Sequence, residues 1–255
     1  MDRITIIKVG GKVVEEPDSL NALLDQFKKI SGHKLLVHGG GLTATVISEK
    51  LGIETKMEEG RRITDAETLE VVTMVYGGLI NKRIVAALQA RGMNAVGLTG
   101  ADLNLITAHK RPVKDIDYGF VGDVDDVNVS ELRLLIEENV VPVVAPLTHD
   151  RTGQLLNTNA DTIAAELATE LSNFYKVFLF FCFEKKGVLL NPDDENSVIY
   201  DLNLTQFNEY KTEGIISAGM IPKLENGFRA KMKGVQEILI TNPENISTGR
   251  GTRLI

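Results

Sequence analysis

The sequence predicts an α/β fold built on a mostly parallel, doubly wound sheet. Within its first fifty residues the chain twice passes from an apolar strand through a glycine turn into a helix, at residues 4–30 and again at 34–51. This alternation is typical of parallel sheets whose crossover helices cover both faces. A later apolar run at 177–183 has the length and the aromatic content of a central strand.

The bulk composition fits a soluble protein with one substantial core. Of 255 residues, 43% are apolar and 25% are charged, the usual proportions for a globular α/β protein. We expect a single domain over residues 1–255, with approximate lobes at 1–149 and 150–255. The net charge of −7 argues against a nucleic-acid-binding surface, although a local basic pocket is compatible with it.

Cysteine and histidine usage gives no sign of a metal site or a disulfide framework. The single Cys182 lies inside an apolar run, as a buried core thiol would, and the four histidines are far apart in the sequence. The N-terminus lacks signal-peptide features, and the run at 177–183 is far shorter than the roughly 20 residues that span a bilayer. We therefore expect a cytoplasmic protein without a membrane partner.

Hydrophobic periodicity and turn residues divide the chain into alternating strands and helices. The long helix at 66–91 has an apolar face, which suits a dimer seam or ordinary core packing equally well, and Gly77–Gly78 interrupts it. In chain order we expect a strand at 4–9, a helix at 20–30, a strand at 34–37, a helix at 43–51, a hairpin at 53–63, the long helix at 66–91, a strand at 94–98, a hairpin within 106–129, a helix at 130–139, a strand at 140–145, a helix at 162–171, a strand at 177–183, a helix that follows 214–223 and ends near 234, a strand at 237–240 and an edge strand at 251–255.

Two glycine turns that follow predicted parallel strands are the first candidates for a ligand site. Gly10 and Gly11 come just after Lys8, and Gly40 and Gly41 end the next strand unit. Neighbouring parallel strands bring such turns to one sheet edge, where backbone N–H groups and helix N-termini bind anions. The lysine beside them suits a phosphoryl group, although each turn alone is equally compatible with backbone geometry.

Other polar residues are candidates for the same chemistry. Phosphoryl transfer needs positive charge where the equatorial oxygens become negative, a role open to Lys8 and Lys223, although Lys223 is equally compatible with a surface lysine at the end of a helix. Asp161 precedes a predicted helix and either caps it or orients the two lysines. Arg62 suits a substrate carboxylate or is a solvated hairpin residue, and Asn157 either donates to a carboxylate or holds its loop.

The sequence lacks two common nucleotide motifs. It contains no Gly-x-x-x-x-Gly-Lys-Ser/Thr run, so it has no P-loop, and the triplet at 39–41 is not Gly-x-Gly-x-x-Gly. A dinucleotide-dependent dehydrogenase is therefore disfavoured, because it would need the second fingerprint and an acid–base residue.

Eight short stretches together resemble the amino acid kinase family, and within it the acetylglutamate kinases. They stand in the family's order, cover nearly the whole chain, and are specific as a set although no single one is. The stretches are Ile7-Lys8-Val9-Gly10-Gly11, Val37-His38-Gly39-Gly40-Gly41, Gly60-Arg61-Arg62-Ile63-Thr64, Ile80-Asn81-Lys82, Val96-Gly97-Leu98-Thr99-Gly100, Gly119-Phe120-Val121-Gly122, Asn157-Thr158-Asn159-Ala160-Asp161 and Gly219-Met220-Ile221-Pro222-Lys223.

The resemblance implies a fold, a reaction and a set of site residues. The fold is a three-layer αβα sandwich, and the reaction transfers the γ-phosphoryl group of ATP, with Mg²⁺ bridging the phosphates, to the side-chain carboxylate of an N-acyl-L-glutamate. N-Acetyl-L-glutamate is the first expectation, and the product is an acyl phosphate of arginine biosynthesis. The implied residues are Lys8, Lys223 and Asp161 for catalysis, Gly10 and Gly11 for phosphate, Gly40, Gly41, Arg62 and Asn157 for the acyl substrate, and Glu184, Gly187, Gly219 and Met220 for the nucleotide, with no protein ligand to a metal.

Departures from the family pattern leave alternatives open. Relatives usually have Ser/Thr-Asp-Val-x-Gly where this chain has Phe-Glu-Lys-Lys-Gly at 183–187, which bears on nucleotide contacts. Leu42 replaces a common proline, and 100–104 differs from the usual Gly-Lys-Asp-Gly-Gly near the acyl substrate. N-Succinyl-L-glutamate is therefore an alternative substrate, and a non-catalytic nucleotide- or effector-binding regulator is an alternative function.

The resemblance also bears on assembly. Arginine-sensitive hexameric relatives carry an N-terminal helical extension, whereas the first strand of this chain begins by Ile4. We expect a homodimer built on the helix at 66–91, without arginine feedback. Carbamate kinase, uridylate kinase, aspartokinase and glutamate 5-kinase are less good matches, because the stretches at 60–64 and 157–161 favour the acylglutamate branch.

Overall fold

Parallel strands form the centre of the fold. The computed structural model describes residues 1–58, 60–216 and 219–255. The strands of the main sheet are β1 (Arg3–Val9), β2 (His33–His38), β5 (Ala95–Leu98), β8 (Val141–Val144), β11 (Lys176–Cys182), β12 (Asp201–Leu202), β13 (Glu237–Thr241) and β14 (Thr252–Leu254). Within the described residues their order is β12-β14-β13-β11-β1-β2-β8-β5, and every neighbouring pair is parallel except β13 with β14. The predicted mostly parallel sheet is confirmed.

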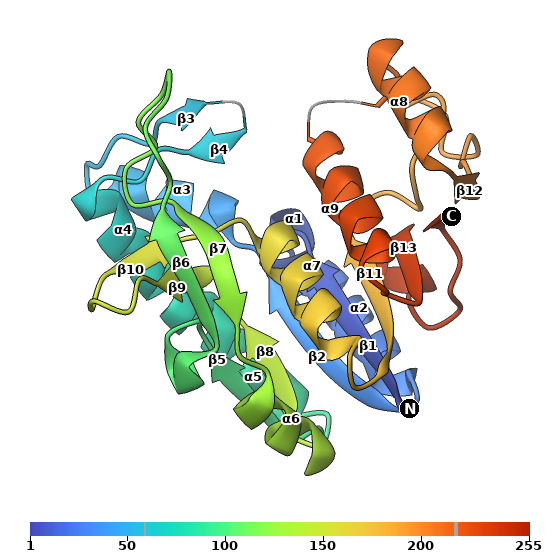
Figure 1. Ribbon diagram of the computed structural model, residues 1–255, viewed down its shortest axis with the longest axis horizontal. Coiled ribbons are helices and arrows are strands. Elements are labelled where there is room, and N and C mark those ends of the chain that lie inside the picture. Colours follow the sequence, from blue (N-terminus) through green and yellow to red (C-terminus); the bar gives the residue numbers. More distant parts are fainter. Residues whose placement is uncertain (59, 217–218) are drawn as a thin grey trace.

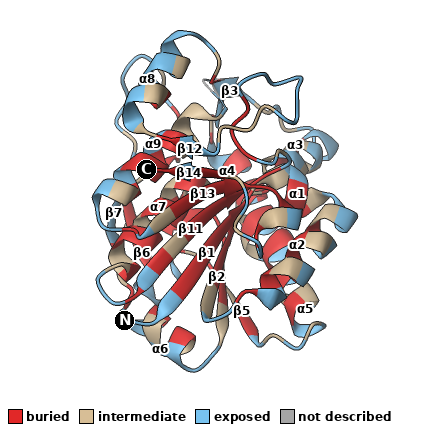
Figure 2. Ribbon diagram, turned by 90° about the vertical axis from the view of Figure 1, so that its right-hand side faces the viewer, coloured by how far each residue is buried: buried red, intermediate tan, exposed pale blue. Residues whose placement is uncertain are grey.

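Helices cover both faces of this sheet, so the three-layer αβα sandwich is confirmed as well (Figure 1). Ile4 and Ile6 of β1 join one buried apolar cluster and Ile7 and Val9 the other, because successive side chains of a strand point to opposite faces. Buried residues line the sheet and the inner sides of the helices (Figure 2). The first face is covered by α6 (Ser130–Glu137), α7 (Ala160–Leu171), α8 (Leu204–Thr212) and α9 (Ile221–Met232), and the second by α1 (Gly11–Glu15), α2 (Pro17–Lys29), α3 (Gly41–Lys50) and a long helix.

A second, smaller sheet and a hairpin extend the chain beyond the main sheet. The smaller sheet contains β6 (Ile106–Lys110), β7 (Gly122–Val127), β9 (Leu147–His149) and β10 (Leu155–Asn157), in the order β10-β9-β6-β7. The antiparallel pair β6 and β7 is the hairpin predicted within 106–129. The other predicted hairpin is also confirmed, as β3 (Met57–Glu58) and β4 (Arg61–Arg62), although residue 59 lies outside the described residues.

The long helix predicted at 66–91 is continuous but changes its hydrogen-bonding pattern in the middle. It consists of α4 (Ala66–Val72), the π-helical stretch η1 (Thr73–Ile80) and α5 (Asn81–Gln89). Gly77 and Gly78 both lie inside η1, so the interruption expected there is a change in hydrogen bonding and not a break in the helix. Within the described residues, Ala66–Gln89 is the one helix long and apolar enough to cross a membrane, and 44% of its most apolar window is buried within the fold.

The last part of the chain differs most from the expectations. The strand predicted at 251–255 is β14, but the edge position belongs to β12, which pairs with it. The helices and strands that the sequence patterns did not indicate include elements from the whole chain: the five-residue α1, the two-residue β12, the three-residue β9 and β10, α8, and the short 3₁₀ helices η2 (Asp102–Asn104) and η3 (Pro243–Asn245). In the predicted lead-in at 214–223, residues 217–218 lie outside the described residues, and α9 begins at Ile221.

A buried polar contact joins the long helix to the carboxyl end of β2. His38 is fully buried, and its Nδ1 lies 2.8 Å from the carbonyl of Gly39, to which only an N–H can donate. Its Nε2 therefore accepts from Asn81 Nδ2 at 3.2 Å, and the same amide group donates to the carbonyl of Val143 at 2.9 Å. Burial lowers the pKa of His38 to about 4, so the ring is neutral near pH 7.

His38 should make the stability of the fold depend on pH. Its pKa in the folded state is about 4, below the value near 6.5 in the unfolded chain, so between these values the unfolded chain binds the proton more readily. The contribution of His38 to the free energy of unfolding is fully present above pH 6.5. It is lost as the pH falls towards 4, and the total loss is about 3 kcal/mol. Urea unfolding of the wild type and His38→Gln at pH 7.5 and pH 5 should show the smaller pH dependence in the variant. Equal pH dependence in the two proteins would contradict this assignment.

Candidate active site

Two hollows lie at the carboxyl ends of the central strands, and the glycine turns separate them. The larger has a volume of about 430 Å³ and is lined by residues 8 and 10–12 and by parts of 183–223. The smaller, of about 210 Å³, is lined by 39–41 together with residues of the hairpin, the long helix and the loop before α7. A Cβ placed on Gly11 would lie 3.6 Å from the backbone nitrogens of both Gly40 and Gly41. The two hollows therefore meet where the two turns meet.

A buried ion cluster lies beside this meeting point. Asp161 is 5% exposed, and its Oδ1 lies 2.7 Å from Nζ of Lys8, which is 6% exposed. Its Oδ2 accepts a hydrogen bond of 3.2 Å from Nζ of Lys223. The three residues come from the end of β1 and the first turns of α7 and α9, so the fold brings together the three predicted catalytic residues.

The helix-cap reading of Asp161 is wrong. The N-cap of α7 is Asn159, whose Oδ1 accepts from the backbone N–H groups of Asp161 and Thr162 at 2.8 and 3.1 Å. The Asp161 carboxylate is thus free to face the two lysines.

The charges of this cluster stabilise one another. Burial alone would raise the pKa of Asp161, but the charges and hydrogen bonds of Lys8 and Lys223 outweigh it and hold that pKa below its usual value. Burial lowers the pKa of the Lys8 ammonium, with Asp161 opposing the shift. An ionised Asp161 neutralises one of the two ammonium groups, and the cluster keeps a net positive charge that faces the larger hollow.

The glycine turns present free backbone donors to the same region. The N–H of Gly10 already donates to the carbonyl of Cys182 at 2.8 Å, and that of Gly39 to the carbonyl of Val9 at 3.0 Å. Within the described part of the chain, the N–H groups of Gly11, Gly40 and Gly41 have no protein acceptor. Of the two glycines expected at the phosphate, only Gly11 therefore has its N–H available.

Hydrogen bonds between the helices that follow the two glycine turns hold these turns close together. Glu15 of α1 accepts hydrogen bonds from the backbone N–H and the hydroxyl of Thr43, in the first turn of α3, at 2.6 and 2.9 Å. The contact joins the helices that follow the two glycine turns. It consequently keeps the free N–H groups of both turns on one small surface.

Arg62 is a buried cation in the wall of the smaller hollow, not a solvated hairpin residue. It is 8% exposed and donates to the carbonyl of Gly41 at 2.7 Å and to the hydroxyls of Thr45 and Thr55 at 2.8 and 3.1 Å. Among the described residues, no carboxylate lies within ion-pairing distance of it. An unneutralised buried guanidinium is costly unless an anion joins it, which suits a ligand carboxylate.

The remaining predicted residues divide between the two hollows. Gly40, Gly41, Arg62 and Asn157 line the smaller one, where the Asn157 side-chain amide donates to the hydroxyl of Thr64 at 3.0 Å. Glu184, Gly187, Gly219 and Met220 line the larger one, together with Lys8 and Lys223. The predicted acyl-substrate and nucleotide residues thus lie in separate hollows, and the two lysines of the ion cluster line the larger one.

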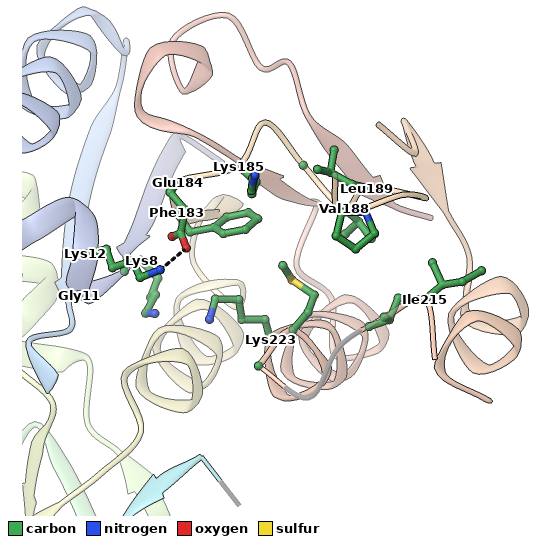
Figure 3. A pocket seen from close by; sticks show the side chains of 16 residues that line it. Lys8, Gly11, Lys12, Phe183, Glu184, Lys185, Val188, Leu189, Ile215 and Lys223 are labelled. Carbon is green, nitrogen blue, oxygen red and sulfur yellow. Dashed lines mark hydrogen bonds and ion pairs between the residues drawn. The ribbon is translucent and has the colours of Figure 1, made fainter. Parts of the chain in front are cut away.

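The larger hollow has a cationic end and an apolar end. Apolar side chains of Phe183, Val188 and Ile215 face it, and Lys12 and Lys185 approach it near Glu184 (Figure 3). Lys12 Nζ lies 3.3 Å from Glu184 Oε1, and these two largely exposed side chains both line the hollow. A flat apolar group with a polyanionic tail matches this arrangement.

Several residues that line these hollows were not singled out by the sequence patterns, Lys12 and Tyr76 among them. For Lys12 a signal exists, because it directly follows Gly10–Gly11. Tyr76 in the smaller hollow has none, since helical periodicity makes it another core residue. Within the described residues, no group of three or more His, Cys, Asp or Glu side chains is placed to hold a metal ion.

Removing the central charge should cost stability. Asp161→Asn keeps the shape but leaves Lys8 and Lys223 without a buried counterion, and the expected loss in unfolding free energy at pH 7 is about 3–5 kcal/mol. The matched control is Glu166→Gln on the same helix, whose carboxylate pairs with the more exposed Arg229 and Lys233. That variant should lose no more than about 1 kcal/mol. Urea denaturation measures both, and equal losses would contradict a special role for the buried cluster.

Comparisons with known proteins agree with this geometry. The amino acid kinase family matches residues 3–242. An acetylglutamate kinase from Bacteroides fragilis is 60% identical over 253 residues, which cover 99% of this chain and 97% of that protein. An acetylglutamate kinase from Methanopyrus kandleri is 40% identical over 251 residues, covering 97% and 98% of the two chains.

Two solved structures share the fold over nearly their whole length. The protein smu.665 from Streptococcus mutans has a TM-score of 0.83 and 27% identity, and the match covers 98% of both chains. Carbamate kinase from Giardia lamblia bound to AMP-PNP has a TM-score of 0.72 at 14% identity, covering 99% of this chain and 98% of that one. From the family match and its full-length relatives, this chain belongs to the amino acid kinase family.

Proposed function

We propose that this chain transfers the γ-phosphoryl group of ATP to the side-chain carboxylate of N-acetyl-L-glutamate, giving an acyl phosphate in arginine biosynthesis. The observation that carries the proposal is the pair of hollows on the two sides of the glycine turns, with Lys8 and Lys223 of the buried cluster lining the larger one. The full-length likeness to acetylglutamate kinases at 60% and 40% identity supports the choice of acceptor.

The nucleotide would occupy the larger hollow. Its base would pack on the apolar end, near Gly187, Gly219 and Met220, and its phosphates would reach Lys12, Lys8 and the cluster. Both carboxylate oxygens of Asp161 already face ammonium groups, so this residue is not free to hold a metal. Mg²⁺ would therefore enter bound to the nucleotide phosphates, whose negative charge it would reduce.

The acyl-amino acid would occupy the smaller hollow. Arg62 would hold its α-carboxylate, and Asn157 its acylamino group, with the side-chain carboxylate directed to the glycine turns. That carboxylate is ionised at neutral pH and can attack without a general base. The protein then supplies mainly position and positive charge.

The cluster would stabilise the charge that gathers on the transferring group. Lys8 and Lys223 would lie on one side of the transferring phosphoryl group. The N–H groups of Gly11 and Gly41 would face it from the region where the two glycine turns meet. Asp161 keeps both ammonium groups in place before the ligands arrive, so little reorganisation is needed during transfer. In this assignment the lysines act on the reacting phosphoryl group and Asp161 positions them.

A hydroxylamine-trapping assay for acyl phosphate tests the proposal. With Mg-ATP we expect turnover on N-acetyl-L-glutamate and little on L-glutamate or L-aspartate. Lys8→Ala should lower kcat by about 10²–10³-fold, because it removes charge at the transition state. Lys211→Ala is the control, since Lys211 is an exposed lysine paired with Glu225 on α9 and lines neither hollow.

The same assay separates the alternatives. Turnover on N-succinyl-L-glutamate in place of the acetyl compound would change the acceptor and keep the reaction. ATP binding without turnover on any acceptor would contradict the kinase proposal and favour a non-catalytic regulator on the same fold.

We also propose a single-domain cytoplasmic homodimer, with its acyl-substrate lobe at 1–149 and its nucleotide lobe at 150–255. Support for the dimer comes from the outer face of the long helix, where Met74 and Leu79 are 55% and 41% exposed. Apolar side chains that are half exposed on one helix suit burial against a second copy.

Charge on this face should separate the subunits. Size-exclusion chromatography with light scattering should give twice the 28.0 kDa chain mass for the wild type and the single chain mass for Met74→Glu combined with Leu79→Glu. Leu134→Glu is the control, because Leu134 is also exposed but lies on α6, at the other face of the sheet. A monomeric or hexameric wild type would contradict the proposed assembly.

A further inference from the structure

The three free N–H groups of the glycine turns belong to three different peptide units. A trans peptide is planar and its C=O points away from its N–H, so a group that binds the carbonyl also sets the direction of the N–H. The carbonyls of Gly10 and Gly40 each accept a hydrogen bond from the helix that follows, from the N–H of Val14 in α1 at 3.2 Å and of Ala44 in α3 at 3.1 Å. These helices therefore direct the free N–H groups of the two residues that come next.

The third peptide unit, between Gly39 and Gly40, is held by a side chain. Nδ1 of His38 donates to the carbonyl of Gly39 at 2.8 Å, and among the residues that the structure describes no backbone N–H donates to this carbonyl. The N–H of the same unit belongs to Gly40, whose nitrogen lies 3.6 Å from the position of a Cβ on Gly11. The ring of His38 thus sets the direction of a free donor at the place where the two turns meet.

A peptide between two glycines has little preference of its own for one direction. Glycine adopts backbone conformations that other residues avoid, so ψ of Gly39 and φ of Gly40 can change together at small cost. A bulkier residue cannot restrict the turn, because a Cβ on Gly40 would overlap the end of the Ile80 side chain. Close packing therefore requires glycine here, and the direction of the peptide has to be fixed from outside.

The long helix fixes the ring that holds this peptide. Nδ2 of Asn81 donates to Nε2 of His38 at 3.2 Å and to the carbonyl of Val143 at 2.9 Å. Because Nε2 accepts, the proton of the neutral ring stays on Nδ1, from which it is donated to the turn. His38 and Asn81 are 0% and 1% exposed, so water does not compete for either contact.

An ordinary core role would not require these polar groups. An apolar side chain of similar size would fill the place of the ring without the cost of burying a polar group. The buried contact joins the sequence stretches at 37–41 and 80–82, and it ends at a turn whose three glycines line the smaller hollow. Its polar groups therefore add directional order to the site, which apolar packing would not supply.

We propose that His38, held by Asn81, is a positioning residue that keeps the N–H of Gly40 directed at the transferring phosphoryl group. The inference rests on the proposed function, because that group exists only if the chain is a kinase. It adds a third backbone donor to those of Gly11 and Gly41. Neither His38 nor Asn81 lines a hollow, so both act through the turn.

Two substitutions of His38 separate its bond to the turn from its bond to the helix. The amide of Asn can place a donor where Nδ1 lies, whereas the amide of Gln can place an acceptor where Nε2 lies. We expect His38→Asn to keep most of kcat. His38→Gln should lower kcat about tenfold, less than the roughly 10²–10³-fold effect of removing such a donor itself. KM for Mg-ATP and for N-acetyl-L-glutamate should stay near the wild-type values, because the donor acts on the transition state.

A purely structural role predicts a different pattern. Each variant keeps one of the two hydrogen bonds of the ring, so their thermal midpoints should fall by similar amounts while their kcat values differ. Equal kcat values in the two variants would overturn the proposal. The matched control is His33→Gln, since His33 lies at the other end of β2 and lines neither hollow. Its kcat and both KM values should equal those of the wild type.

Crystal structures of the two variants give a second readout that needs no substrate. The peptide between Gly39 and Gly40 should keep its direction in His38→Asn and rotate in His38→Gln. An unchanged peptide in His38→Gln would overturn the proposal, as would a rotated peptide with the kcat of the wild type.

Failure of the proposed function would look different. A wild type without turnover on any acceptor would contradict the kinase proposal, and the role of His38 in transfer would fall with it. A wild type that turns over N-acetyl-L-glutamate, with a His38→Gln variant that equals it, would overturn only the present inference.

Discussion

The ion cluster of Lys8, Asp161 and Lys223 is the constraint on which the rest of the structure depends. Three charged groups can lie together in a nearly dry environment only if their charges and hydrogen bonds compensate one another. The distances of 2.7 and 3.2 Å meet that condition. They require a central strand to end at the same place where two helices begin. Apolar side chains of similar size would stabilise the fold as well or better, so the retained charge points to chemistry and not to stability.

The fold could be read largely from the sequence because its main signals are local. Apolar runs followed by glycine turns predicted the parallel strands, and the polar ends of the hairpins marked their limits. The helices and strands that the sequence did not predict have weak local signals. β9, β10 and β12 are two or three residues long, too short to show alternation, and α8 buries only Phe207, so it has no apolar stripe. The capping box of Asn203 and Gln206 was the available signal for α8.

The site was less accessible to residue-level reasoning, because its members are far apart in the chain. Nothing near Lys223 distinguishes it from a surface lysine at a helix start, and only the likeness to a family singled it out. For Asp161 the sequence left a helix cap and an ion-pairing role open. The choice between them depends on backbone geometry, which gives the cap to Asn159, two residues earlier. Tyr76 is a third kind of case, since its contacts depend on a π-helical stretch that periodicity does not reveal.

The separation of the two hollows has a consequence for the order of events. They share no lining residue and meet only at the glycine turns, so a ligand in one does not block entry to the other. The geometry therefore imposes no compulsory sequence of addition, and both ligands can be present at once. Transfer would then be direct, within a ternary complex. In the buried cluster the one carboxylate, that of Asp161, is already engaged by both ammonium groups, so it does not stand ready to carry the phosphoryl group on the protein.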